Sequence, residues 1–145
     1  MELNATYTFE ADPERVFDLL TDSSVVAACL PGCEKLEAIG ENRYKAVLSM
    51  GLAAVTGRFE GTVELRDLNR PASYALVIDG KGKQGFVKGQ ATIELSEDAA
   101  GTIVAVKANA KVAGAIARVG QRLLGGAAKV MTDRFFGCMQ AKAAG

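Results

Sequence analysis

The sequence predicts an α+β fold in which a curved, seven-stranded antiparallel sheet wraps around one long C-terminal helix. Seven segments alternate apolar and polar residues, which is typical of strands with one buried face. Two short helical segments follow the first strand, and a longer one with apolar residues three and four positions apart ends the chain. A one-sided sheet and a one-sided helix bury each other. A length of 145 residues fits one domain, residues 1–145.

The first strand and the two short helices are indicated by local signals. Residues 2–10 alternate, with Tyr7 and Phe9 on the apolar side. Asp12 followed by Pro13 is typical of a helix start, because the carboxylate caps free N–H groups and proline suits the first turn. Ser23 or Ser24 is expected to cap the second helix, which ends before a Pro-Gly turn at 31–32.

A meander of six further strands is predicted before the long helix. The segments are 34–39, 43–50, 55–67, 73–79, 86–95 and 102–112. Residues 51–54 are interpreted as a bend or bulge. The segment 80–85, GKGKQG, is similar to a phosphate-binding loop but lacks the P-loop spacing, so a mobile basic hairpin loop is the favoured interpretation.

The C-terminal helix is expected to run from about Val112 to Ala144. Its predicted apolar stripe consists of Ile116, Val119, Leu123, Leu124, Ala127, Val130, Met131 and Phe135. Arg134 falls near the centre of this stripe, and we expect it to lie beyond the sheet, because burying an unpaired guanidinium is costly.

Charge is unevenly distributed although the net charge is zero. The chain up to Asp67 is acidic and the remainder is basic. Three basic residues of the helix, Arg118, Arg122 and Lys129, form a candidate surface for a partner or the membrane; a solvated helix face is the alternative. A pI near 6.3 and the lack of aromatic residues among the basic ones argue against nucleic acid.

The three cysteines, Cys29, Cys33 and Cys138, are expected to be reduced. Their number is odd, and the N-terminus has no secretory signal, so the predicted location is the cytoplasm. A metal pair at Cys29 and Cys33 is an alternative, but the chain has no histidine. We therefore expect small buried apolar residues, and neither a metal nor another cofactor.

A cavity between sheet and helix is the candidate ligand site. The residues predicted to line it are Tyr44, Leu48, Met50, Phe59, Leu76, Ile78, Phe86, Val87, Leu123, Leu124 and Met131. Many small residues share the inward side, and small residues opposite one another leave space. Tyr44 and Tyr74 would offer hydroxyls to a ligand carbonyl. The alternative is an ordinary filled core.

Four motifs resemble the carbon monoxide dehydrogenase CoxG family of START-like (SRPBCC) helix-grip proteins. They are LPGCE at 30–34, GRFEG at 57–61, GFVKGQA at 85–91 and GAIARVG at 114–120. The resemblance implies a non-catalytic accessory protein that binds a hydrophobic molecule, a respiratory quinone or lipid. It would assist a molybdenum hydroxylase in membrane recruitment, with peripheral attachment to the inner face of the membrane, or in electron transfer to quinone.

Two other functions remain open from the sequence. A START-like cyclase or dehydratase would need a polar catalytic group inside the cavity, and the inward positions offer only tyrosines. A docking protein would have a filled core and use its basic helix face. The sequence leaves open a monomer or a homodimer.

Overall fold

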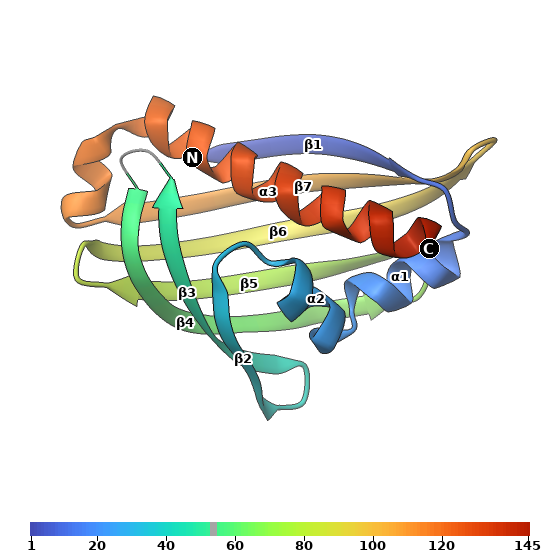
Figure 1. Ribbon diagram of the computed structural model, residues 1–145, viewed down its shortest axis with the longest axis horizontal. Helices are drawn as coiled ribbons and strands as arrows, with labels where there is room; N and C mark the ends of the chain where they lie inside the picture. Colours follow the sequence, from blue (N-terminus) through green and yellow to red (C-terminus); the bar gives the residue numbers. More distant parts are fainter. Residues whose placement is uncertain (53–54) are drawn as a thin grey trace.

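The computed structural model describes residues 1–52 and 55–145 (Figure 1). It contains one seven-stranded sheet in the order β1-β7-β6-β5-β4-β3-β2, and every neighbouring pair is antiparallel. Two short helices, α1 and α2, and the long helix α3 lie on one face of the sheet (Figure 1). The predicted fold class is therefore confirmed. The bend predicted at 51–54 includes Ala53 and Ala54, which lie outside the described residues.

The strands and helices follow the predicted order. The strands are β1 (Glu2–Phe9), β2 (Cys33–Gly40), β3 (Arg43–Leu52), β4 (Val55–Asn69), β5 (Ser73–Gly82), β6 (Gly85–Asp98) and β7 (Gly101–Ala113). The helices are α1 (Pro13–Leu20), α2 (Ser23–Cys29), the 3-10 helix η1 (Ala115–Val119) and α3 (Gln121–Ala144). The predicted loop at 80–85 is a tight hairpin, because β5 continues to Gly82 and β6 begins at Gly85.

Both short helices begin at aspartates. The Asp12 carboxylate accepts a hydrogen bond from the Arg15 backbone N–H at 2.8 Å, as the sequence predicted. For α2 the capping residue is Asp22, which accepts from the Ser24 N–H at 3.0 Å, so the expectation of a serine cap is wrong. A carboxylate stabilises the exposed N–H groups of a first turn more strongly than a hydroxyl does, because it is charged.

The long helix begins later than predicted. Strand β7 extends to Ala113, the single turn η1 follows, and α3 starts only at Gln121. Gly114 and Gly120 have φ values of 90° and 98°, in a region that L side chains rarely adopt. These two glycines allow the chain to turn from the end of β7 into η1 and from η1 into α3.

The buried face of α3 is rotated relative to the predicted stripe. Its buried residues are Leu124, Phe136, Met139 and Ala143, whereas Leu123 is 53% exposed. The predicted stripe was traced from Ile116 and Val119, which precede α3. Each residue of error in where the helix begins rotates the traced stripe by about 100° around the helix axis. Arg134 is exposed because of this rotation, although buried helix residues follow it.

The buried apolar residues form two separate clusters. The larger, here called the covered cluster, lies beneath α1, α2 and the C-terminal half of α3 and includes Phe9, Phe17, Tyr74 and Met139. The smaller, here called the end cluster, consists of Val55, Phe59, Ile116 and Leu124, with Met1, Met50, Val112, Val119 and Ala127 packed against it. The middle of the sheet lies between them.

Two of the three cysteines are joined, which corrects the expectation of reduced thiols. Cys29 at the end of α2 forms a disulfide with Cys138 of α3, across 109 residues of sequence. Cys33 is the free thiol among the described residues. The alternative of a metal pair at Cys29 and Cys33 is excluded, because Cys29 is bonded to Cys138 of α3.

Candidate functional site

The strand register assembles small residues into a continuous surface in the middle of the inner face. One row across the sheet reads Tyr44, Val63, Ile78, Gly89 and Ala110. The next reads Ala46, Gly61, Gly80, Val87 and Val112. These two rows, here called the small-residue floor, lie between the covered cluster and the end cluster.

Solvent reaches this floor even though it belongs to the central strands. Ile78 on β5 is 39% exposed, which is unusual for an isoleucine on the inner face of a sheet. The three atoms nearest to a Cβ atom built at Gly89 all belong to the sheet, with the Asn109 backbone O nearest at 3.5 Å. A Cβ atom built at Gly80 would meet, apart from its chain neighbours, the Glu60 backbone O at 3.8 Å. The floor is therefore open on its inner side.

The facing part of α3 is also poor in bulk. Residues that share the inward side with Leu124 in the first turns are Gly125 and Ala128, because a helix turns 100° per residue. A Cβ atom at Gly125 would meet no atom within 4 Å. The first turns of α3 are thus as poor in bulk as the sheet floor. The space between them is here called the inner groove.

The predicted lining residues divide into three groups. Tyr44, Ile78 and Val87 lie on the small-residue floor, and Leu48 lies one row further towards the end cluster, opposite Phe59. Met50, Phe59 and Leu124 come together in the end cluster.

The third group lies outside the floor and the end cluster. Leu76 packs against the covered cluster, and Met131 is half-buried on α3. For two residues the predicted position is wrong. Leu123 points to solvent. Phe86 is 43% exposed on the outer face, where the Lys88 Nζ lies 6.0 Å from its ring centroid, because β6 begins on the opposite parity.

The two candidate tyrosines have different environments. Tyr44 is half-buried on the small-residue floor. The other residues in the two rows of the floor have apolar side chains or are glycines. Tyr74 is 4% exposed in the covered cluster and meets Phe17 edge-on at 5.5 Å. Burial raises the pKa of the Tyr74 phenol, so it stays protonated. Of the two, Tyr44 is the one placed to meet a molecule in the inner groove.

Polar contacts hold α3 over the edge of the sheet at β1. The Tyr7 hydroxyl donates to Asp133 at 2.8 Å, and its ring stacks on Phe136 at 4.4 Å. Burial and this hydrogen bond raise the pKa of Tyr7, while the Tyr7 and Lys129 contacts lower the pKa of Asp133. At the other end, the Arg15 Nε donates to the Ala143 backbone O at 3.1 Å. These contacts fix α3 against β1 and α1.

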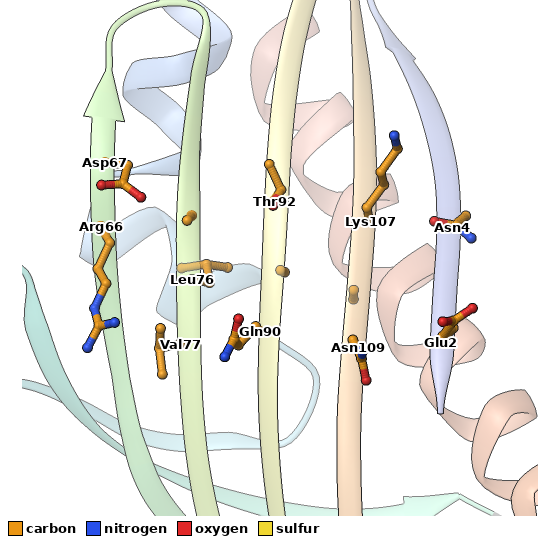
Figure 2. Close-up of a pocket in the computed structure, with 13 residues that line it drawn as sticks. Glu2, Asn4, Arg66, Asp67, Leu76, Val77, Gln90, Thr92, Lys107 and Asn109 are labelled. Carbon is orange, nitrogen blue, oxygen red and sulfur yellow. The ribbon is translucent and has the colours of Figure 1, made fainter.

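A hollow of about 500 Å³ lies on the outer face of the sheet (Figure 2). Gln90, Thr92 and Asn109 line its floor, and charged residues such as Arg66 and Lys107 lie towards its sides (Figure 2). Its polar side chains are largely exposed, and Arg66 pairs with Glu64 at 3.2 Å. This hollow has the character of a solvated surface, as the alternation predicted for this face.

The predicted basic surface is divided by the structure. Arg118 lies on η1 and Arg122 on the first turn of α3, both exposed at one end of the molecule. Lys129 lies further along α3 and pairs with Asp133 at 3.2 Å. Lys129 therefore belongs to the contacts that hold α3, and not to the surface that contains Arg118 and Arg122.

Sequence reasoning missed Gly80, Gly125 and Ala128 as groove residues. Gly80 was assigned to a loop, although the alternation of Tyr74, Leu76 and Ile78 continues through it. Gly125 and Ala128 would have followed from starting the helix after Gly120. No described helix combines the length and hydrophobicity needed to cross a membrane.

Solved structures similar to this chain share its architecture. A conserved protein from Geobacillus kaustophilus is 36% identical, with a TM-score of 0.96, over 99% of this chain and 95% of that chain. A protein from Thermus thermophilus and Ara h 8.0201 are 16% and 12% identical, each with a TM-score of 0.73 over 99% of this chain and 97% of theirs. At such low identity the last two show the fold alone. No curated protein matches the sequence.

A curved antiparallel sheet with a long C-terminal helix on one face defines a helix-grip protein. The family model for the CoxG subunit of carbon monoxide dehydrogenase matches residues 6–144. The chain belongs to the CoxG family, as its four motifs indicated.

Proposed function

We propose that this protein binds an apolar molecule, a respiratory quinone or a lipid, in the inner groove. The observation that carries the proposal is the small-residue floor, where an isoleucine of a central strand is exposed between two filled clusters. Leaving apolar surface in water is unfavourable by about 25 cal/mol per Å². An apolar ligand over Ile78 and Val87 would remove that cost.

The bound molecule is expected to place a carbonyl or hydroxyl group near Tyr44. This phenol is the polar group of the two floor rows, and one oriented hydrogen bond in an apolar site is a common source of specificity. The Tyr44 phenol can donate to a quinone carbonyl or to a lipid carboxylate. The remaining floor side chains are apolar or small, which supports a binding role without catalysis.

Membership of the CoxG family supports a role beside a molybdenum hydroxylase of the carbon monoxide dehydrogenase type. We infer that the protein carries its ligand for that enzyme, assisting either its recruitment to the membrane or its electron transfer to quinone. In a reconstituted assay, the hydroxylase should reduce a membrane quinone faster when this protein is added. An unchanged rate at saturating protein concentration would contradict the accessory role.

Native mass spectrometry tests the ligand directly. The probes are a short-chain ubiquinone analogue and palmitate, each titrated into protein purified from its own host and extracted with organic solvent. A one-to-one adduct with the quinone alone, or with palmitate alone, identifies the ligand class. The proposal fails if neither probe forms an adduct and the extract contains no quinone or lipid; a docking protein would then be the better interpretation.

The Tyr44→Phe variant measures how much the Tyr44 hydroxyl contributes to the affinity for the ligand. Its ring keeps the apolar contacts of the groove, so only the hydrogen bond is removed. A net hydrogen bond of about 1 kcal/mol corresponds to roughly 5-fold weaker binding of the quinone analogue. Tyr74→Phe is the matched control, because Tyr74 lies in the covered cluster and should leave the affinity unchanged.

A further inference from the structure

Beyond Gly80, which belongs to the small-residue floor, the GKGKQG segment lies against η1 at one end of the molecule. The Ile116 backbone N–H donates to the Gln84 backbone O at 2.7 Å, and Gly114 approaches the Gly85 backbone closely. Figure 1 shows η1, the start of α3 and the β5–β6 turn together at the left end. Segments that are distant in sequence thus form one surface.

Six exposed basic side chains gather at this end. They are Lys81, Lys83, Lys88, Lys111, Arg118 and Arg122, here called the basic tip. The sequence contains no acidic residue between Asp79 and Glu94, and none between Asp98 and Asp133. Within the described residues, no carboxylate lies within 4.0 Å of a basic-tip nitrogen.

The strand register brings two carboxylates near the basic tip. Glu60 stands opposite Lys81, and Asp79 stands opposite Lys88. Neither of these described pairs forms an ion pair, and four of the six charges remain uncompensated when both carboxylates are counted. The ion pairs found in the described chain, such as Asp18 with Arg70, involve other residues. The charge of this surface is therefore available to a partner.

Two large apolar side chains project from the same end. Phe86 lies near the start of β6, close to Lys88, and Leu123 lies in the first turn of α3 next to Arg122. Basic residues with interspersed exposed aromatic and leucine side chains are typical of surfaces that lie in the interface of an anionic bilayer. Lysine predominates, and its flexible point charge suits a diffuse anionic surface better than a fixed carboxylate geometry.

We propose that the basic tip docks on a bilayer containing anionic phospholipids. The inference deepens the proposed function and rests on it, since a carrier of a membrane-dissolved ligand must meet the membrane. Docking at this end would bring the end cluster, to which Ile116 of η1 belongs, towards the lipid. The inner groove begins directly behind that cluster, so its ligand would have a short path.

Vesicle co-sedimentation tests the docking surface. The full chain is mixed with vesicles of phosphatidylcholine alone, or of equal parts phosphatidylcholine and phosphatidylglycerol. Binding is expected only to the anionic vesicles, and it should fall strongly at about 1 M salt, where the Debye length is about 3 Å. Lys81→Gln/Lys83→Gln should weaken binding roughly 25-fold, since each basic residue near such a surface contributes about a factor of five. Phe86→Ser should weaken vesicle binding both at low salt and at about 1 M salt, because salt does not screen the insertion of an apolar side chain.

The matched control is Lys129→Gln/Lys142→Gln, which changes the net charge equally but away from the basic tip. This variant should bind anionic vesicles as the wild type does, and all variants should keep the wild-type melting temperature because the changed residues are exposed. Equal losses in both double variants would overturn the assignment to the tip. Absence of binding by the wild type would overturn membrane docking and leave an acidic protein surface as the fitting partner.

Failure of docking and failure of ligand binding are distinguished by the vesicles and by one further variant. The vesicles contain no quinone, and Gly89→Leu fills the inner groove without touching the basic tip. Unchanged vesicle binding by Gly89→Leu supports docking through the tip. Loss of vesicle binding in Gly89→Leu, with the tip intact, would show that the groove captures the phospholipid and would overturn the proposal.

Discussion

Replacing Gly89 with leucine should block the inner groove while preserving the fold. A Cβ atom at this position meets the Asn109 backbone O at 3.5 Å, the Ala110 Cβ at 3.7 Å and the Ile78 Cβ at 4.0 Å, all ordinary contacts. None of these neighbours belongs to α3, so the rest of the leucine side chain would extend over the floor towards the helix. The substitution therefore adds apolar bulk in the space that the ligand would use.

The expected effects on stability and affinity have opposite signs. Glycine within a strand is unfavourable by about 0.5–1 kcal/mol, and partial burial of leucine adds a similar gain, so the free energy of unfolding should rise by about 1 kcal/mol. The added carbons, about four, displace a similar number of ligand methylene groups at about 0.8 kcal/mol each. The affinity for a short-chain ubiquinone analogue should fall by about 3 kcal/mol, or roughly 150-fold.

Urea unfolding and native mass spectrometry measure the two quantities on the same samples. Gly89→Ala provides an intermediate step, with a single added carbon and an affinity loss of about 4-fold. Gly137→Leu is the matched control, because Gly137 is exposed on α3 and its Cβ would meet nothing within 4 Å. If Gly89→Leu folds stably and binds the quinone with wild-type affinity, the ligand does not lie over this floor and the reasoning is refuted.

Three further predictions concern the contacts that hold α3. Met139→Ala should lower the free energy of unfolding by about 2–5 kcal/mol in urea titrations, because Met139 is fully buried in the covered cluster. Cys29→Ser should cost about 4 kcal/mol in the same assay, since the bond to Cys138 closes a loop of 109 residues. Tyr7→Phe should move the pKa of Asp133 back up towards its ordinary value in an NMR titration. The folded-state pKa of Asp133 is lowered, so its stabilising contribution is present above the ordinary carboxyl pKa and disappears as the pH falls through the folded value. The variant should therefore lose less stability on acidification than the wild type.

The controls for these variants use residues of the same types. Leu123→Ala should change stability by no more than about 0.5 kcal/mol, and a cost equal to that of Met139→Ala would mean that the predicted stripe, not the observed one, faces the sheet. Alkylation of unfolded protein without reductant should modify Cys33 alone. Three modified thiols would contradict the disulfide, and no pH-dependent difference between Tyr7→Phe and the wild type would contradict the Asp133 contact.

The strands could be predicted because their faces are encoded locally. Alternation in 86–95 assigned Gly89 and Ala91 to the inner side without any knowledge of their neighbours. The Asp12 cap was likewise recognisable, since the capping carboxylate and the N–H it accepts from are three residues apart. Phe86 was assigned wrongly against the same alternation, which puts it with Lys88 on the side opposite to Val87 and Gly89.

The helix phase and the disulfide could not be predicted in this way. Gly120 separates η1 from α3, and only its φ of 98° shows that the apolar residues before it belong to a different element. Cys29 and Cys138 meet because α2 packs on α3, a contact between segments that carry no mutual signal in the sequence. The basic tip could not be predicted either, because it depends on the contact between the β5–β6 turn and η1, where Ile116 donates a hydrogen bond to Gln84.

The sequence by itself determined the fold class, the inward small residues and the charge asymmetry of this protein, because composition and short periodicities act within one element. The tertiary structure alone decided that Gly61, Gly80 and Gly89 stand in adjacent rows of the sheet, and that Ile78 beside them is exposed. Register and helix rotation depend on long-range contacts, and whether small residues leave space depends on what stands across from them.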